Sequence, residues 1–187
     1  MHSTRLRKRF ETEILVHLEQ AYNLARWLLR DPVEAEDIVQ QSCIRAYKAF
    51  ARYRGESPAG WLLTIVRNTS YNYLKQKKKH QNLVSFEEAI HTNDEDSDVN
   101  PCHISLDPEQ LIEISEQQGL VRTAINKLSA EYRETIYLRE IACYSYKEIA
   151  SIVELPIGTV MSRLSRARCQ LRKILLNEQQ QERTDAV

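Results

Sequence analysis

The chain has 187 residues, enough for one or two small domains that each bury a core. Apolar residues make up 42% of it and only 4 are glycine, which excludes a disordered chain and favours helices. The sequence contains no run of 18 apolar residues, which is about what a membrane-spanning helix needs. Its basic N-terminal residues are followed by Glu11 and Glu13 instead of the apolar core of a signal peptide. We therefore expect a cytoplasmic protein with no membrane insertion.

The net charge of zero conceals three blocks of opposite sign. Residues 1–82 carry a net charge of +7, residues 83–118 carry −10 with no lysine or arginine, and residues 119–187 carry +3. Basic ends around an acidic centre are typical of two modules that face nucleic acid. We predict an all-α protein of two small helical domains, joined by an acidic flexible linker over 83–118. The linker is either a solvated spacer or an acidic strand that occupies a basic channel of a partner.

Apolar residues at helical spacing predict a bundle of three or four helices in the first domain. The first helix covers about residues 10–30. Asp31 followed by Pro32 and Glu34 predicts the N-cap and first turn of a second helix, which runs to about Phe50. This second helix exposes a row of polar side chains: Asp37, Gln40, Gln41, Arg45 and Lys48.

A third helix begins at Ser57-Pro58, and its apolar stripe runs from Trp61 to Leu74. Tyrosine rings stack on unpaired bases for about 1–3 kcal/mol per base, and lysines hold phosphates, so its other side suits a single strand of DNA. A soluble amphipathic helix with a lysine-rich end has the same composition, and this alternative stays open. The side chains on this face are Arg67, Asn68, Tyr71, Asn72, Lys75, Lys77, Lys78 and Lys79.

In the second domain, amphipathic helices are expected at about 119–129 and 131–142, with Val121 and Ile141 among the core residues.

A helix-turn-helix pattern follows these two helices. Ser145 and Glu148 form an S-x-x-E capping box, and Pro156 and Gly158 mark the turn. A helix with one apolar edge and one Arg/Ser edge can lie in the DNA major groove. The groove-facing residues of this second helix are Thr159, Ser162, Arg163, Ser165, Arg166 and Arg168.

No motif for catalysis is present. The sequence has no glycine-rich phosphate loop, no H-E-x-x-H and no nucleophile elbow. Its four cysteines, at 43, 102, 143 and 169, are widely spaced with no C-x-x-C pair. Cys102-His103 is more simply a solvent-exposed pair than a metal or oxidant site. We expect no enzyme, no metal and no cofactor.

Three segments, in this order, resemble the extracytoplasmic-function sigma factors of the sigma-70 family, and especially their envelope-stress type. DPVEAEDIVQQSCIRAYKAF (31–50) resembles the polymerase-binding helix. WLLTIVRNTSYNYL (61–74) resembles the helix that melts and reads the minus-ten promoter element, and LSAEYRETIYLREIA (128–142), continuing to Arg168, resembles the minus-35-binding domain. The resemblance covers about residues 10–80 and 119–175.

The resemblance implies a role for each polar face. The row from Asp37 to Arg45 would meet core RNA polymerase, Asn68 would lie near a flipped minus-ten base, and the Arg/Ser face after the turn would enter the minus-35 groove. The acidic linker would thread the polymerase cleft. Met161 stands where many relatives carry Lys or Arg. The resemblance therefore does not imply which minus-35 sequence this chain prefers. An anti-sigma factor is a further implied partner.

We therefore expect a sigma factor that binds core RNA polymerase, directs it to promoters through the minus-10 and minus-35 elements, and promotes DNA melting. The alternative is a dimeric helix-turn-helix regulator that binds duplex operator DNA and senses a ligand with its N-terminal domain. Residues 53–79 suit single-stranded DNA better than a small-molecule pocket, which favours the sigma factor.

Overall fold

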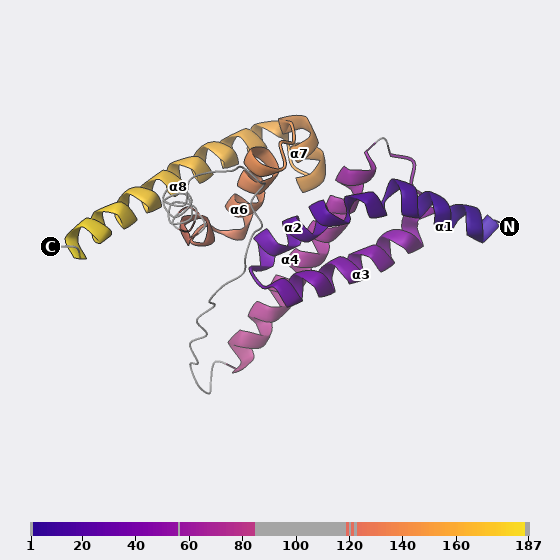
Figure 1. Cartoon of the computed structure of the whole chain (residues 1–187), viewed down its shortest axis with the longest axis horizontal. Coiled ribbons are helices and arrows are strands. Elements are labelled where there is room, and N and C mark those ends of the chain that lie inside the picture. The colour runs from indigo at the N-terminus through magenta and orange to yellow at the C-terminus, as the bar shows by residue number, and fades with distance from the viewer. Residues whose placement is uncertain (1, 56, 85–118, 120, 122, 186–187) are drawn as a thin grey trace, which may run out of the picture.

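Every regular element in the computed structural model is helical among the residues that it describes, which are 2–55, 57–84, 119, 121 and 123–185 (Figure 1). The prediction of an all-α protein is confirmed. Leu83 and Val84 still belong to a helix, and the rest of the predicted acidic linker lies outside the described residues. No described helix combines the length and apolar character needed to cross a bilayer.

The N-terminal helices are α1 (His2–Glu13), α2 (Leu18–Leu29), α3 (Pro32–Phe50) and α4 (Pro58–Val84). A short 3-10 turn, η1 (Leu15–His17), separates α1 from α2, so the single helix predicted over about 10–30 is wrong. Neither proline nor glycine marks this break, and apolar spacing alone could not locate it.

The predicted helix starts in this half are confirmed. The Asp31 carboxylate accepts a hydrogen bond from the Glu34 amide at 2.9 Å, with Pro32 in the first turn of α3. The Ser57 hydroxyl accepts from the Gly60 amide at 3.1 Å and so caps α4. Both side chains satisfy backbone N–H groups that a helix start leaves without an intrahelical partner.

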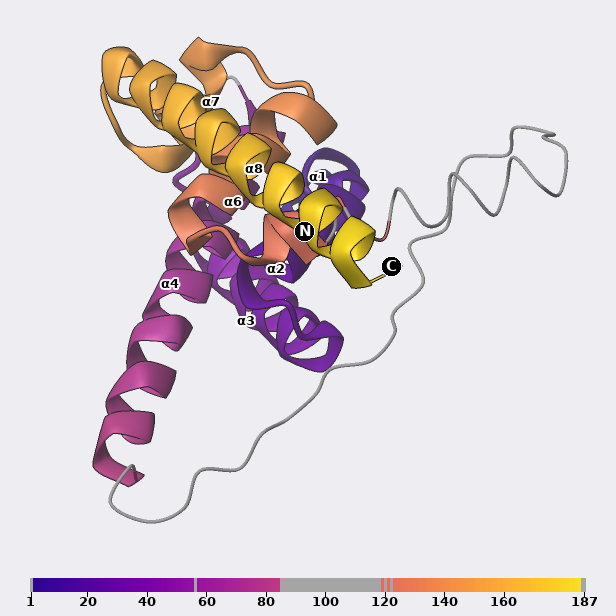
Figure 2. The same ribbon diagram turned by 90° about the vertical axis from the view of Figure 1, so that its left-hand side faces the viewer.

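Helices α2, α3 and α4 pack pairwise around a common apolar core, and α1 joins them through an aromatic contact. The Phe10 and Phe50 rings meet edge to face with centroids 5.3 Å apart. Beyond the core, the C-terminal half of α4 projects away from the rest of the described molecule in both views (Figure 1; Figure 2). Its last turns are therefore open to a partner on several sides.

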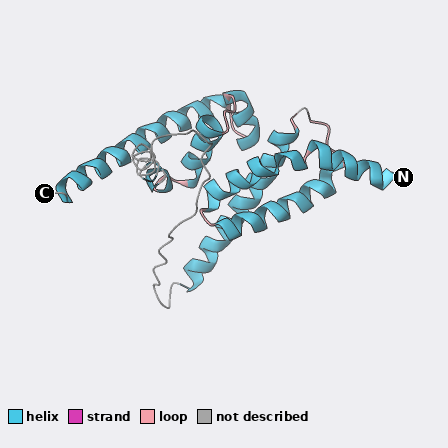
Figure 3. Ribbon diagram, viewed as in Figure 1, coloured by secondary structure: helices cyan, strands magenta, loops and turns pink. Residues whose placement is uncertain are grey.

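The C-terminal helices are α6 (Ala130–Ile136), α7 (Tyr146–Val153) and α8 (Ile157–Asp185), with a π-helical turn, η2 (Tyr137–Ile141), directly after α6 (Figure 3). The helix expected over 131–142 therefore changes its winding part-way.

Two residues expected in the core of this half are exposed instead. Ile141 is 50% exposed, because the π-helical turn places an extra residue in each turn and shifts the face that follows. Val121 is 42% exposed, while Ala124, Ile125 and Leu128 point inward from the same segment. The core assignments of Val121 and Ile141 are wrong.

The helix-turn-helix has the predicted capping box. The Ser145 hydroxyl accepts from the Glu148 amide at 3.3 Å, and the Glu148 carboxylate accepts from the Ser145 amide at 2.8 Å. Helix α7 ends at Glu154, whose φ of 56° is left-handed. Because α8 already begins at Ile157, Gly158 lies in its first turn, and the assignment of Gly158 to the turn is wrong.

The two groups of helices are packed against each other. Helix α2 contacts α6, and α4 contacts α7, so one buried apolar cluster runs through both groups (Figure 1; Figure 2). The Trp27 and Tyr137 rings meet across this boundary with centroids 5.8 Å apart. This packing decides which side chains of α4 reach solvent.

The capping box yields a stability prediction. Replacing Ser145 with alanine removes the acceptor for the Glu148 amide and should lower the free energy of unfolding by about 1 kcal/mol. Thermal and urea unfolding of the full chain, followed by circular dichroism, measures this change. Ser151→Ala, at an exposed position of the same helix, is the matched control. Equal effects of the two substitutions would show that the capping box contributes nothing.

Candidate nucleic-acid interface

The polar face of α4 is exposed along most of its length. Asn68, Asn72 and Lys75 are open to solvent, as are the lysines at 77, 78 and 79 in the C-terminal half of the helix. Lys77 is partly engaged, because its Nζ lies 2.6 Å from the Glu34 carboxylate on α3. Amide groups are thus presented near the core of the bundle and cations beyond it.

Arg67 and Tyr71, expected on the same open face, lie instead against α6. The Arg67 side chain is 15% exposed, and its Nε is 2.7 Å from the Glu134 carboxylate. The Tyr71 hydroxyl donates to the other oxygen of Glu134 at 3.1 Å, and the Arg67 guanidinium sits 4.8 Å from the centre of the Tyr71 ring. The expected exposure of these two side chains is wrong, because the C-terminal helices cover them.

Glu134 is the buried partner of this face that the sequence did not reveal. Its side chain has no exposed surface, and burial raises its pKa although Arg67 and Tyr71 oppose the shift. Burial, followed by the nearby Glu134 charge, also raises the pKa of Tyr71. A charged residue in a segment such as Tyr132-Arg133-Glu134 normally predicts a solvated face, and no local signal distinguishes this one.

Arg133, the neighbour of Glu134, is also buried at the boundary between the two helix groups. It donates to the Trp27 and Leu28 carbonyls at 2.9 and 3.0 Å, and to the Leu128 carbonyl at 2.6 Å. Burial, with Arg30 nearby, lowers the pKa of Arg133 to about 10. The carbonyls of Trp27 and Leu28 belong to the last turn of α2, where helical carbonyls lack intrahelical partners and favour a cation.

The polar face of α8 is open, but its arginines differ in whether they form ion pairs. Ser162, Ser165 and Arg166 are exposed, and Thr159 is partly exposed. Arg163 is largely covered, with its guanidinium 3.2 Å from the Glu131 carboxylate. Arg168 donates through Nε to Glu140 at 3.0 Å. Within the part of the chain that the structure describes, Arg166 is the arginine of this face with no ion pair.

The predicted polar row on α3 is exposed as expected. Asp37, Gln40 and Gln41 reach solvent, and Arg45 does so while donating to the Thr69 hydroxyl at 3.3 Å. The row also contains exposed apolar side chains that sequence patterning missed: Ile44 is 56% exposed and Tyr47 is 39% exposed. A mixed polar and apolar surface of this kind is suited to protein contact.

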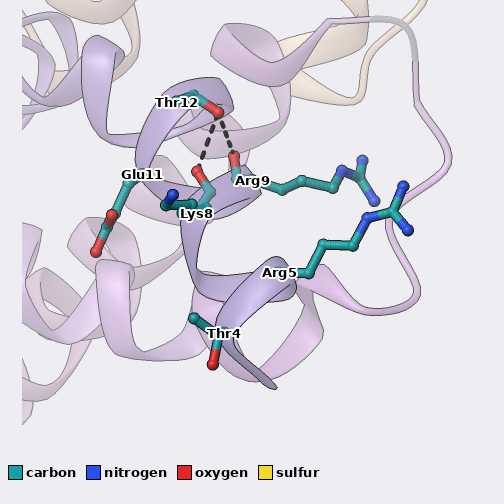
Figure 4. A pocket seen from close by; sticks show the side chains of 6 residues that line it. All are labelled: Thr4, Arg5, Lys8, Arg9, Glu11 and Thr12. Atoms are coloured by element: carbon teal, nitrogen blue, oxygen red, sulfur yellow. Dashed lines mark hydrogen bonds between the residues drawn. The ribbon is translucent and has the colours of Figure 1, made fainter. Parts of the chain in front are cut away.

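One hollow of the described surface is too open to be a small-molecule site. It runs along α1 and is lined by side chains of this helix alone, in which the Thr12 hydroxyl donates to the Lys8 carbonyl at 3.0 Å (Figure 4). Among the described residues no group of three or more His, Cys, Asp or Glu side chains could hold a metal ion. Cys102 and His103 lie outside them, whereas Cys43, Cys143 and Cys169 are free thiols.

Two sigma factor families match this chain. Sigma-70 region 2 matches residues 14–80, and Sigma-70, region 4 matches residues 118–171.

Individual relatives agree with this assignment. An ECF RNA polymerase sigma-E factor of Haemophilus influenzae is 36% identical over 78% of this chain and 75% of its own length. The factor of the same name from Escherichia coli K12 is 38% identical over 72% of this chain and 70% of its own. The solved structure of the sigma factor RpoE of Bartonella quintana, in complex with the anti-sigma factor NepR, matches at 30% identity with a TM-score of 0.67, covering 90% of this chain and 97% of that one. The chain therefore belongs to the extracytoplasmic-function sigma factors of the sigma-70 family.

Proposed function

We propose that the exposed faces of α4, α8 and α3 are the minus-10, minus-35 and core-polymerase contacts of this sigma factor. A sigma factor binds core RNA polymerase, directs it to specific promoters and promotes DNA melting. The chain performs no chemistry of its own, because the polymerase carries the catalytic centre. Residues 1–82 and 119–187 are the two DNA-facing domains, and residues 83–118 connect them. The protein acts in the cytoplasm, where the DNA is.

The observation that carries this proposal is the presence of two cationic faces of different chemistry on separate helices. The face of α4 offers the amides of Asn68 and Asn72 followed by a row of lysines, which is suited to bases that have left the duplex and to their phosphates. The face of α8 offers hydroxyls and the unpaired guanidinium of Arg166, which is suited to a major groove. A duplex-binding regulator needs the second face but has no use for the first.

The row on α3 supports polymerase binding for a different reason. Asp37, Gln40 and Gln41 lie on the same side as the exposed Ile44 and Tyr47. Large apolar side chains left exposed among polar ones mark protein contacts more often than nucleic-acid contacts.

An anti-sigma partner is part of the proposal. The Bartonella quintana RpoE that resembles this chain is solved in complex with the anti-sigma factor NepR. We propose that this chain, too, is held by a protein of that class.

Run-off transcription tests the function as a whole. Core polymerase with this chain should initiate at defined positions on a pool of genomic DNA fragments, and core polymerase alone should not. A dimeric operator-binding regulator would instead footprint a palindrome without polymerase. The absence of promoter-dependent initiation on every template would refute the proposed function.

Asn68 is predicted to act in melting. Asn68→Ala removes an amide placed to bond a base edge, so it should reduce open-complex formation about tenfold and leave polymerase binding unchanged. Permanganate reactivity of unpaired thymines measures open-complex formation, and fluorescence anisotropy measures polymerase binding. Asn23→Ala, an exposed asparagine on α2, is the control. Equal loss of both activities would show that this role is wrong.

Arg166 is predicted to contribute more to the minus-35 contact than Arg168. Arg166→Ala should weaken this contact by about 1–3 kcal/mol if the guanidinium reads a base. Arg168→Ala should cost less, because the Arg168 side chain is already engaged by Glu140. Promoter libraries randomised at minus 35 measure both effects. An unchanged minus-35 preference in Arg166→Ala would contradict the assignment.

A further inference from the structure

We infer that Met161 on α8 reads the methyl group of a thymine in the minus-35 element. The element that this chain prefers should therefore hold a thymine at one fixed base pair, in addition to the base that Arg166 contacts. This inference rests on the proposed role of the α8 face and assigns a preferred base to it.

Met161 is an apolar side chain on the exposed side of α8. It is 52% exposed, and the neighbouring Ser162 and Ser165 are exposed as well. Ile157, one helical turn earlier on the same side, is 49% exposed. The apolar residues that α8 buries against its own domain are a different set: Val160, Leu164 and Ala167. Ile157 and Met161 therefore form an apolar edge that stays in contact with solvent beside the polar face.

Met161 lies near the start of α8, in the part of the helix that suits contact with bases. Helix α8 begins at Ile157, so Met161 is about one turn into it. In a helix-turn-helix, the N-terminal residues of the second helix contact base edges in the major groove. Methionine is also long, unbranched and flexible, so its side chain can reach the floor of the groove and adapt to what it meets there.

Thymine is the base whose major-groove edge suits such a side chain. Its C5-methyl group is the apolar feature of that groove, whereas guanine, adenine and cytosine present hydrogen-bond donors and acceptors. The Met161 side chain has no donor, and its thioether sulfur is only a weak acceptor. Contact with a methyl group removes apolar surface from water on both sides, and contact with another base would leave polar atoms without a partner.

The polar side chains of the α8 face leave much of the base discrimination to Arg166 and Met161. The other arginines of this face, Arg163 and Arg168, are held in ion pairs with carboxylates of their own domain. Serine hydroxyls both donate and accept, so the serines of this face suit several bases. Arg166 can therefore select a base by hydrogen bonds, and Met161 can select one by its methyl group.

A hollow in the surface borders Met161. Its volume is about 460 Å³, and it is lined by α8 side chains and by Tyr146 at the start of α7. Ser165 and Cys169 continue its lining along α8. A methyl group that enters this hollow meets Met161 and Tyr146 together, so it is removed from water more completely than on the convex surface of a single helix.

A promoter library is the first test. Holoenzyme assembled from core polymerase and the full chain is selected on promoters randomised at minus 35. The wild-type chain should enrich a thymine at one position, and Met161→Ala should lose this enrichment while it keeps the preference that depends on Arg166. Alanine is a good helix former, so α8 should stay folded in this variant, and circular dichroism verifies that it does.

Uracil isolates the contribution of the methyl group. Uracil presents the same hydrogen-bonding groups as thymine and lacks only the C5-methyl, so it replaces the enriched thymine in a fluorescein-labelled promoter duplex. Holoenzyme with the wild-type chain should bind the uracil duplex about fourfold more weakly, as expected for one buried methyl group. Holoenzyme with Met161→Ala should bind the two duplexes alike, because the side chain that contacts the methyl group is already absent.

Leu176→Ala is the matched control. Leu176 is also 52% exposed on α8, but it lies about four turns beyond Met161. The substitution removes an apolar side chain of similar size and exposure from outside the groove-facing part of the helix. Both the enrichment of thymine and the difference between the thymine and uracil duplexes should be unchanged.

The results separate this inference from the proposed function. If the wild-type chain has a minus-35 preference that Arg166→Ala removes, but no thymine enrichment depends on Met161, the inference is overturned and the proposed function stands. Equal weakening by uracil in wild-type and Met161→Ala holoenzyme also overturns the inference, since the methyl group would then act without Met161. If the wild-type chain has no minus-35 preference at all, the proposed role of the α8 face fails and the inference fails with it.

Discussion

The arrangement of this sigma factor depends on two adjacent charges buried where its domains meet. Arg133 completes the C-terminal end of α2 by binding the Trp27 and Leu28 carbonyls. Glu134 completes the polar face of α4 by binding Arg67 and Tyr71. Because the two residues are consecutive on α6, the positions of α2 and α4 relative to the C-terminal domain are set together. A shift along one helix would break the bonds to the other.

Buried charges of this kind fix position more than they add stability. Removing an ion from water costs several kcal/mol, and a buried pair recovers about that much when its geometry is good. Glu134 and Arg67 would regain water if the two helix groups separated, so their ion pair contributes little net free energy to the packing of one group on the other. The apolar contacts between α2, α4, α6 and α7 contribute the rest. Such a boundary is well defined in position.

Local signals predicted most of the fold, and long-range contacts explain what they missed. The Asp31 cap, the Ser145–Glu148 capping box and the exposed row on α3 each depend on residues within a few positions of one another, and all three were predicted. The burial of Arg67 depends on Glu134, which is 67 positions away. Periodicity assigns a side chain to one face of its own helix and contains no information about what covers that face.

The C-terminal helices partly cover the α4 face and leave the α8 face free. These two faces suit different forms of DNA. A major groove exists in duplex DNA before any melting, and the α8 face that suits it is open to solvent. Unstacked bases exist only after melting, and the α4 face that suits them is the one tied to Glu134.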